Sequence, residues 1–184
     1  MPIPAKKIED LFNFYLLHGF DCSTDEIVEA LNISRKTFFN RYKSKDNAMK
    51  MAIEFWYETF QCRFQEKIAL CNHAVEELIQ YGYELQYVRS NERYYYQYLV
   101  DNNLFTAEDS PFVTTLEKII QKGIQHYQFK EDVNEKLYAR YALNNIVHYN
   151  YMKNETGEVI QFLLSPIVTD RTKALLKELD LDSF

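Results

Sequence analysis

A short helix with a basic, amide-bearing face is the part of this sequence best suited to chemistry. At about 100° per residue, Phe38 and Tyr42 turn to one side of the segment 35–42. The opposite side then presents, at spacing i, i+3, i+4 and i+7, Lys36, Phe39, Asn40 and Lys43. An Asn amide can pair with adenine, and Lys or Arg can contact guanine or phosphate. This face suits the major groove of DNA, and the alternative is a solvated basic face with no partner.

Charge is distributed unevenly along the chain. Residues 32–50 carry six basic side chains against one acid, a net charge of +5, whereas the whole chain of 184 residues has a net charge of −6. The remaining residues therefore carry −11. A compact basic segment on an acidic chain is typical of a nucleic-acid contact that is confined to one end of the molecule.

The helices that must position this face are marked by capping signals. A first helix has an apolar stripe and ends at Gly19. Ser23 with Glu26 forms a capping box that begins the second helix. Asn32 tolerates a left-handed backbone and suits a tight turn, and Ser34 can cap the third helix, residues 35–42. Two helices joined by such a turn make a helix-turn-helix.

The rest of the chain predicts further helices and an all-α fold. Glycine and proline occur only four times each, so there is little of the turn chemistry that sheets need. Ser44 caps a fourth helix that runs from residue 45 to about 70. Further helices are predicted near 74–88, 91–104, 110–127, 131–155, 158–165 and 170–180. We expect an N-terminal helix-turn-helix DNA-binding domain over residues 1–46 and a larger helical ligand-binding and dimerisation domain over residues 47–184.

Composition and motifs argue against several classes of protein. Cys22, Cys62 and Cys71 are odd in number and lack CxxC spacing, so we expect reduced thiols and no zinc site. No signal peptide and no run of 18 apolar residues is present, which favours a soluble, intracellular protein. The chain has no Gly-rich phosphate loop, no Gly-x-Ser-x-Gly motif and no HExxH motif. We therefore expect no enzyme activity, no metal and no cofactor.

The segment 5–55 carries an ordered set of short motifs. They are Gly19-Phe20 at the end of the first helix, Ser23-Thr24 at the start of the second, Ile27 and Ala30 within it, Ile33-Ser34 at the turn, Thr37-Phe38-Phe39 and Tyr42 in the third, and Ser44-Lys45-Asp46 behind it. In order and spacing this segment resembles the TetR family of bacterial transcriptional regulators. One residue fewer separates the first two motifs than is usual, Lys36 replaces a small residue, Phe39 replaces tyrosine and Asn32 replaces glycine. Because two of these changes fall on the third helix, the operator sequence of a relative does not carry over.

The resemblance implies roles for eight residues in contacting double-stranded DNA. Thr24 and Lys45, at the starts of the second and fourth helices, would contact phosphates. The groove would be faced by Lys36, Thr37, Phe39 and Asn40, and the flanking Arg35 and Arg41 would contact the backbone. The family also implies a homodimer on a palindromic operator, acting in the bacterial cytoplasm at the nucleoid.

Aromatic residues are abundant in the larger domain, and they have two interpretations. Tyr94, Tyr95, Tyr96 and Tyr98 point in directions too different to face one cavity together. Aromatics at helical spacing are often simply core. The functional interpretation is a cavity of several hundred Å3 for a small apolar or aromatic effector, neutral or weakly charged. Its candidate walls are Trp56, Phe60, Tyr87, Tyr94, Tyr98 and His148. A void lined by Arg89, Arg93 or Lys122 would instead indicate an anionic ligand.

The predicted helix 131–155 is apolar around most of its circumference, which is typical of a helix buried against both a core and a partner. In the TetR-like family the last long helices pair across a two-fold axis, and the segment 170–180 is the expected companion or a terminal lid. Tyr141 and Ile146 are the residues expected at this interface.

The sequence thus predicts a ligand-responsive transcriptional regulator, a repressor released from DNA by its effector. One rival is a regulator of the same fold that responds to a protein partner and binds no small molecule. A second rival, a helical enzyme with an appended basic module, is disfavoured because no catalytic spacing is present.

Overall fold

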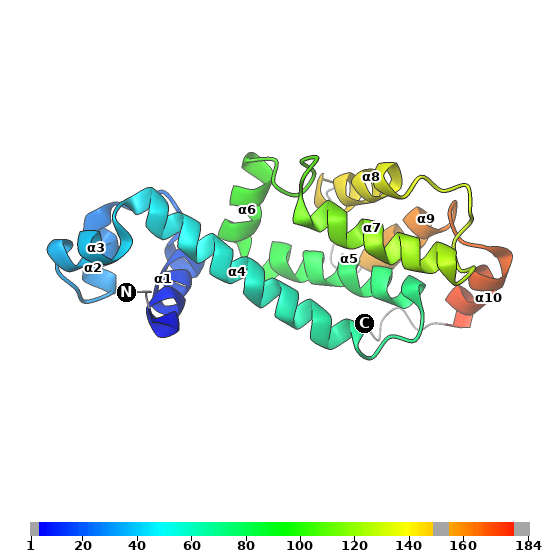
Figure 1. Ribbon diagram of the computed structural model, residues 1–184, viewed down its shortest axis with the longest axis horizontal. Coiled ribbons are helices and arrows are strands. Elements are labelled where there is room, and N and C mark those ends of the chain that lie inside the picture. The colour runs from blue at the N-terminus through cyan, green and yellow to red at the C-terminus, as the bar shows by residue number, and fades with distance from the viewer. Residues whose placement is uncertain (1–3, 149–154, 179–184) are drawn as a thin grey trace.

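A computed structural model describes residues 4–148 and 155–178, and these residues form ten helices (Figure 1). The helices are α1 (Ala5–His18), α2 (Thr24–Ala30), α3 (Arg35–Tyr42), α4 (Lys45–Ile68), α5 (Ala74–Asn91), α6 (Arg93–Asp101), α7 (Pro111–Gln125), α8 (Glu135–His148), α9 (Thr156–Leu164) and α10 (Asp170–Glu178). The fold is all-α, as the sequence predicts. Within the described residues the only extended pairing is a single antiparallel bridge between Phe129 and Val168.

The molecule is elongated, and α4 joins its two ends (Figure 1). Helices α1, α2 and α3 gather at one end, and α1 packs against both α4 and α6. At 1.5 Å per residue, the 24 residues of α4 span about 36 Å. This one helix therefore spans both the α1–α3 end and the body (Figure 1).

Side-chain caps set the starts of the first helices where the sequence predicts them. The Ser23 hydroxyl accepts a hydrogen bond from the Glu26 backbone N–H, and the Glu26 carboxylate accepts one from the Ser23 N–H. The Ser34 and Ser44 hydroxyls accept the backbone N–H groups of Thr37 and Asn47 and cap α3 and α4. Asn32 has the left-handed backbone predicted for the turn, with φ 49°. The helix-turn-helix geometry thus follows from local sequence.

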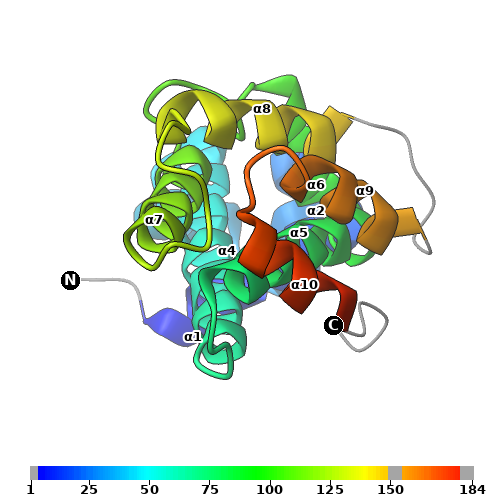
Figure 2. The same cartoon turned by 90° about the vertical axis from the view of Figure 1, so that its right-hand side faces the viewer.

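The body is built around α5. Helices α4, α6, α7, α8 and α9 all contact it, and the end-on view shows it in their midst (Figure 2). From α4, Trp56, Phe60 and Phe64 repeat every four residues and are buried against this side of the body. Tyr81 of α5 and Phe112 of α7 complete the aromatic core around Phe60.

The predicted start of α8 differs from the structure. Helix α8 begins at Glu135 rather than 131, because the Asn134 carboxamide oxygen accepts the Leu137 N–H and acts as the cap. The preceding residues instead cross to the segment before α10, where Lys130 N–H donates to the Ile167 carbonyl. Residues 149–154 of the predicted helix lie outside the described residues. Among those described, no helix combines the length and hydropathy needed to cross a bilayer.

Candidate nucleic-acid interface

Helix α3 has one buried and one exposed face, divided as its sequence predicts. Phe38 and Tyr42 are fully buried, and the Tyr42 hydroxyl donates to the Lys7 carbonyl of α1 at 2.9 Å. On the opposite side, Lys36 and Asn40 are exposed and Phe39 is 45% exposed. The buried anchors fix the rotation of α3, so these three side chains point to solvent together.

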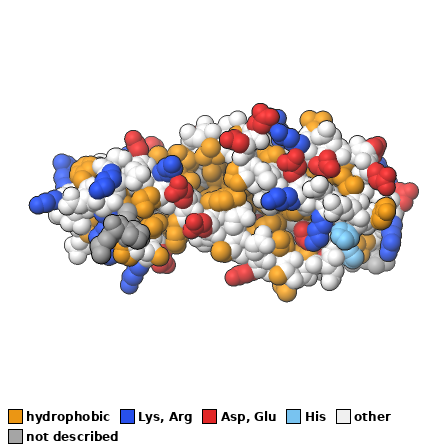
Figure 3. Space-filling model, in the orientation of Figure 1, with side chains coloured by type: hydrophobic (Ala, Val, Ile, Leu, Met, Phe, Trp, Pro, Cys, Tyr) orange, Lys and Arg blue, Asp and Glu red, His pale blue; other side chains and the backbone are white. Residues whose placement is uncertain are grey.

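Lys43, the fourth residue predicted on this face, ends the helix. Its backbone has φ 70°, and its ammonium group donates to the Asn40 carbonyl at 3.0 Å. The lysine thereby satisfies one of the free carbonyls at the C-terminus of α3. Basic side chains are prominent over this end of the molecule in the space-filling view (Figure 3).

Arg35 is engaged with the neighbouring helix. Its guanidinium contacts the carboxylate of Asp25, on α2, through two nitrogens, with Nε at 2.5 Å from Oδ1. The hydrogen bond from Arg35 holds the pKa of Asp25 below its ordinary range. Because both side chains are exposed, the pair is reinforced little by burial. In the free protein it ties α2 to α3 and neutralises the charge of Arg35.

The remaining predicted contacts lie at the starts of α2 and α4 and along α3. Thr24 and Lys45 are the first residues of α2 and α4, where backbone N–H groups and the helix dipole favour an anion. The Thr37 hydroxyl is shared with Ser34 at 2.9 Å, which places it in the cap of α3. Arg41 lies over the Tyr42 ring, 5.7 Å from its centroid.

The six aromatic and histidine residues predicted to line an effector cavity are not brought together around one space. Trp56 and Phe60 are fully buried in the core, whereas Tyr87 and His148 are exposed. Tyr94 packs on Gly19, and Tyr98 lies 4.9 Å from the Phe20 ring, both at the α1–α2 connection. Of the six, Trp56 lines a cavity between α4 and α7.

This cavity has a volume of about 230 Å3. It is partly open to solvent and is bordered by α4, the end of α6, the connection 102–110 and the start of α7. Its lining is mainly apolar: Ile53, Trp56, Tyr57, Leu99, Leu104, Ala107, Asp109, Ser110, Pro111 and Phe112. The lining contains no Arg or Lys. The i, i+3, i+4 spacing of Ile53, Trp56 and Tyr57 in the sequence indicates that they share one face of α4. Nothing in the sequence indicates that the connection 102–110 folds against that face.

A buried charge network next to Trp56 was not predicted. Arg63 of α4 donates to Glu84 of α5 and to Glu92 at the α5–α6 junction, both at 2.7 Å. The indole N–H of Trp56 donates to the other oxygen of Glu92, and Lys67 contacts Glu84 at 2.8 Å. Burial alone would lower the pKa of Arg63, but its hydrogen bonds with the two carboxylates raise it. The sequence feature that could have indicated this network is Glu84, an acid among the apolar residues of α5 that needs a partner if it is buried.

The tyrosines of α6 connect the cavity to the end of the molecule that carries α1, α2 and α3 (Figure 1). The Tyr95 hydroxyl donates to the Phe12 carbonyl of α1 at 3.2 Å, and its ring stacks on Trp56 with centroids 5.6 Å apart and planes at 12°. Tyr96 turns the other way and donates to the Val147 carbonyl of α8. Tyr94, Tyr95 and Tyr98 therefore hold α6 against α1 and the α1–α2 connection. Within the described part of the chain, no three His, Cys, Asp or Glu residues are grouped so as to hold a metal ion.

Comparison with known proteins identifies the architecture. No protein-family model and no curated protein sequence matches the chain. Among solved structures, it is similar to a TetR-family transcriptional regulator from Cytophaga hutchinsonii, with 17% identity, a TM-score of 0.66, and 89% of this chain and 93% of that chain covered. For the ketosteroid transcriptional regulator KstR2 of Mycobacterium tuberculosis, the identity is 12%, the TM-score 0.61, and the coverage 90% and 94%. For a gamma-butyrolactone receptor (ArpA-like protein), the identity is 12%, the TM-score 0.68, and 94% of this chain and 91% of that chain are covered.

Proposed function

We propose that this chain, which has the fold of TetR-family transcriptional regulators, is a DNA-binding transcriptional regulator that contacts its operator through α3. The observation that carries the proposal is the exposed Lys36–Phe39–Asn40 face on a helix whose other side is fully buried. An Asn amide beside a lysine can contact base edges, and an exposed phenyl ring can contact a thymine methyl group. Thr24 and Lys45 are the proposed phosphate contacts at adjoining helix starts. Chromosomal DNA as the partner would place its action at the bacterial nucleoid.

We propose that two copies of the chain associate through α8 and α9. Leu137 and Tyr141 of α8 and Phe162 of α9 are large apolar side chains left exposed, with Phe162 75% exposed. A groove of about 310 Å3 borders Phe162 and Val159. Such a patch on one face favours an isologous partner. Tyr141 fits this interface, whereas Ile146 is buried within the subunit and belongs to its core.

We propose that the cavity beside Trp56 takes a small apolar or aromatic effector without a strong charge. Its apolar lining, free of Arg and Lys, supports an effector of this class over an anion and over a protein partner. KstR2 is named a ketosteroid regulator and the ArpA-like protein a butyrolactone receptor, both for compact organic molecules. Because the cavity adjoins α4 and α6, which both pack on α1, an occupant would favour one position of the DNA-facing end. Release of DNA on effector binding would make the protein a repressor.

The DNA-binding proposal is tested by fluorescence anisotropy with palindromic DNA from upstream of the gene. We expect affinity to fall steeply as salt rises, because phosphate contacts release counterions. Asn40→Ala should cost roughly 1–3 kcal/mol and relax preference at one base position. Lys45→Ala should weaken binding to all sequences about equally.

Two outcomes would contradict this assignment. Sequence preference altered by Lys45→Ala, with affinity for other DNA unchanged, would show that Lys45 contacts bases. Binding unaffected by Asn40→Ala at every position would remove α3 from the interface. Lys118→Ala, an exposed lysine on α7 in the body, is the matched control for loss of one positive charge.

A further inference from the structure

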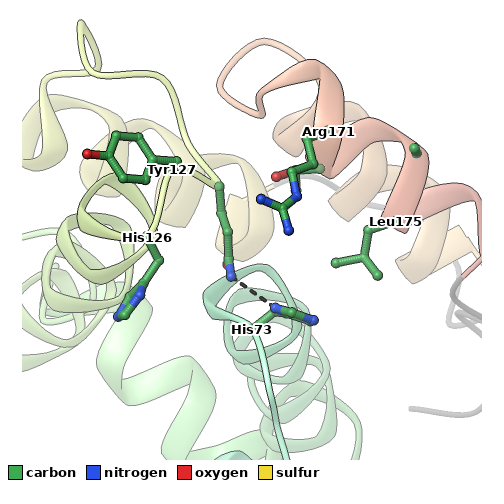
Figure 4. A pocket seen from close by; sticks show the side chains of 8 residues that line it. His73, His126, Tyr127, Arg171 and Leu175 are labelled. Atoms are coloured by element: carbon green, nitrogen blue, oxygen red, sulfur yellow. Dashed lines mark hydrogen bonds between the residues drawn. The ribbon is translucent and has the colours of Figure 1, made fainter.

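A second pocket lies at the end of the molecule farthest from α3, where α10 closes over the starts of α5 and of the connection after α7 (Figures 1 and 4). Its volume is about 290 Å3. It is lined by His73, His126, Tyr127, Gln128, Arg171, Thr172, Ala174 and Leu175. It shares no lining residue with the cavity beside Trp56.

The pocket is rich in hydrogen-bond donors and has no acidic side chain in its lining. The Arg171 guanidinium points across it toward His73 (Figure 4) and forms no hydrogen bond or ion pair within residues 4–148 and 155–178. No Asp or Glu lines it. The acids at the adjoining helix starts are engaged elsewhere: Glu76 accepts the Asn72 and His73 backbone N–H groups, and Asp170 pairs with Lys173. Among the residues that the structure describes, the Arg171 guanidinium therefore has no counter-charge in this pocket.

The hydrogen bonds around His73 determine which of its ring nitrogens can donate. The Val75 backbone N–H can only donate, and it contacts the carboxamide oxygen of Gln128 at 3.3 Å. The Gln128 amide nitrogen therefore faces His73 Nδ1, 3.0 Å away, and donates to it (Figure 4). A neutral imidazole that accepts at Nδ1 carries its proton on Nε2. His73 is thus held in the tautomer whose Nε2–H is a donor.

We propose that this pocket binds a small organic anion through a carboxylate or phosphate group. The planar fork of Arg171 can hold two oxygens of such a group in a bidentate contact, and His73 Nε2–H supplies a further donor. Leu175, beside them, provides an apolar surface for the rest of the molecule. Arg171 is itself exposed at the mouth of the pocket, and His126 and Tyr127 lie exposed at its rim. The inference rests on these residues alone and is independent of DNA binding.

The test uses the full-length protein without DNA, titrated separately with inorganic phosphate and with benzoate. Binding is followed by the imidazole NMR signals of the four histidines, assigned with His73→Gln and His126→Gln variants. We expect a saturable shift of the His73 signal with at least one probe, and Arg171→Gln should weaken that binding about tenfold or more. Arg171→Lys, which keeps the charge but loses the fork, should weaken it as well. The probe that binds more tightly identifies the head group.

Lys177→Gln is the matched control, because it removes one positive charge from the exposed side of the same helix. It should leave the affinity within about twofold. The proposal is overturned if neither probe gives a saturable shift. It is equally overturned if His18 and His148 respond together with His73, or if Arg171→Gln and Lys177→Gln weaken binding alike, since general attraction to positive charge would then explain the result.

Discussion

Gly19 is the residue on which the connection between α1 and α2 depends. Its backbone has φ 78° and ψ −173°, a region that is almost confined to glycine. A Cβ atom added there would lie 2.8 Å from Cδ1 of the Tyr94 ring. Two separate physical reasons thus require glycine at this point, and the second comes from α6, 75 positions further along the chain.

We expect Gly19→Ala to lower the free energy of unfolding by roughly 1–3 kcal/mol through backbone strain, with a further loss from the contact with Tyr94. Urea unfolding followed by circular dichroism measures the change. A double-mutant cycle with Tyr94→Ala separates the two causes, because only the ring contact depends on Tyr94. Full recovery of stability in the cycle would show that the backbone conformation contributes nothing.

At the scale of elements, the network around Arg63 joins α4 to α5 and to the α5–α6 junction. Its guanidinium forms ion pairs with Glu84 and Glu92, both of which are buried, and Lys67 supplies the second positive charge. Removing one partner of a buried ion pair leaves an uncompensated charge. The same network fixes Glu92, which accepts the indole N–H of Trp56. The charge pair therefore positions α6 relative to α4.

We expect Arg63→Met to lower the free energy of unfolding by about 2–4 kcal/mol, somewhat less than for a fully buried pair because the Arg63 side chain is 27% exposed. Lys67→Met is the control: Lys67 is more exposed and Glu84 keeps its bond to Arg63, so about 1 kcal/mol or less is expected. Chemical denaturation of both variants measures this. Equal losses would mean that the network acts through the general charge of α4 and not through Arg63.

Elements with local signals could be predicted from sequence, whereas their contacts could not. Ser23, Ser34 and Ser44 lie within three residues of the groups that they cap, so the starts of α2, α3 and α4 are local properties. The exposed face of α3 follows from helical geometry. Asn134 is an equally local cap, but the helix was predicted to begin at residue 131, before this cap.

The candidate effector cavity was beyond sequence reasoning for a different reason. Whether Tyr94, Tyr95 and Tyr98 face a cavity or a neighbouring helix depends on α1, some 80 positions earlier in the chain. Six of the ten lining residues come from the connection 102–110 and the first residues of α7, and helical periodicity does not predict the path of this segment. Packing between distant segments, and not helix propensity, assigns these side chains their roles.

At the scale of the whole molecule, a palindrome has two half-sites, and one chain carries one α3. Two copies must therefore hold their α3 helices at a fixed spacing to contact both half-sites. We expect a dimer by sedimentation at micromolar concentration. Phe162→Asp should give a folded monomer with greatly weakened operator binding, because a charge would be buried at the interface. Leu70→Asp is the control, since Leu70 is 84% exposed at the α4–α5 connection, away from α8 and α9. A wild-type monomer, or a dimer that survives Phe162→Asp, would contradict the proposed interface.

Trp56 is the only tryptophan among the 184 residues, and fifteen tyrosines accompany it. Nearly all long-wavelength ultraviolet emission of the protein therefore comes from one known indole, in the wall of the cavity and stacked on Tyr95. We expect a small neutral aromatic compound that enters the cavity to change this emission saturably. Ala107→Phe, which narrows the cavity, should abolish the change and leave DNA binding intact. DNA release by such a compound without any change in Trp56 emission would place the effector site outside this cavity. If the emission does change, Trp56 reports binding directly, and candidate effectors can be screened without a label.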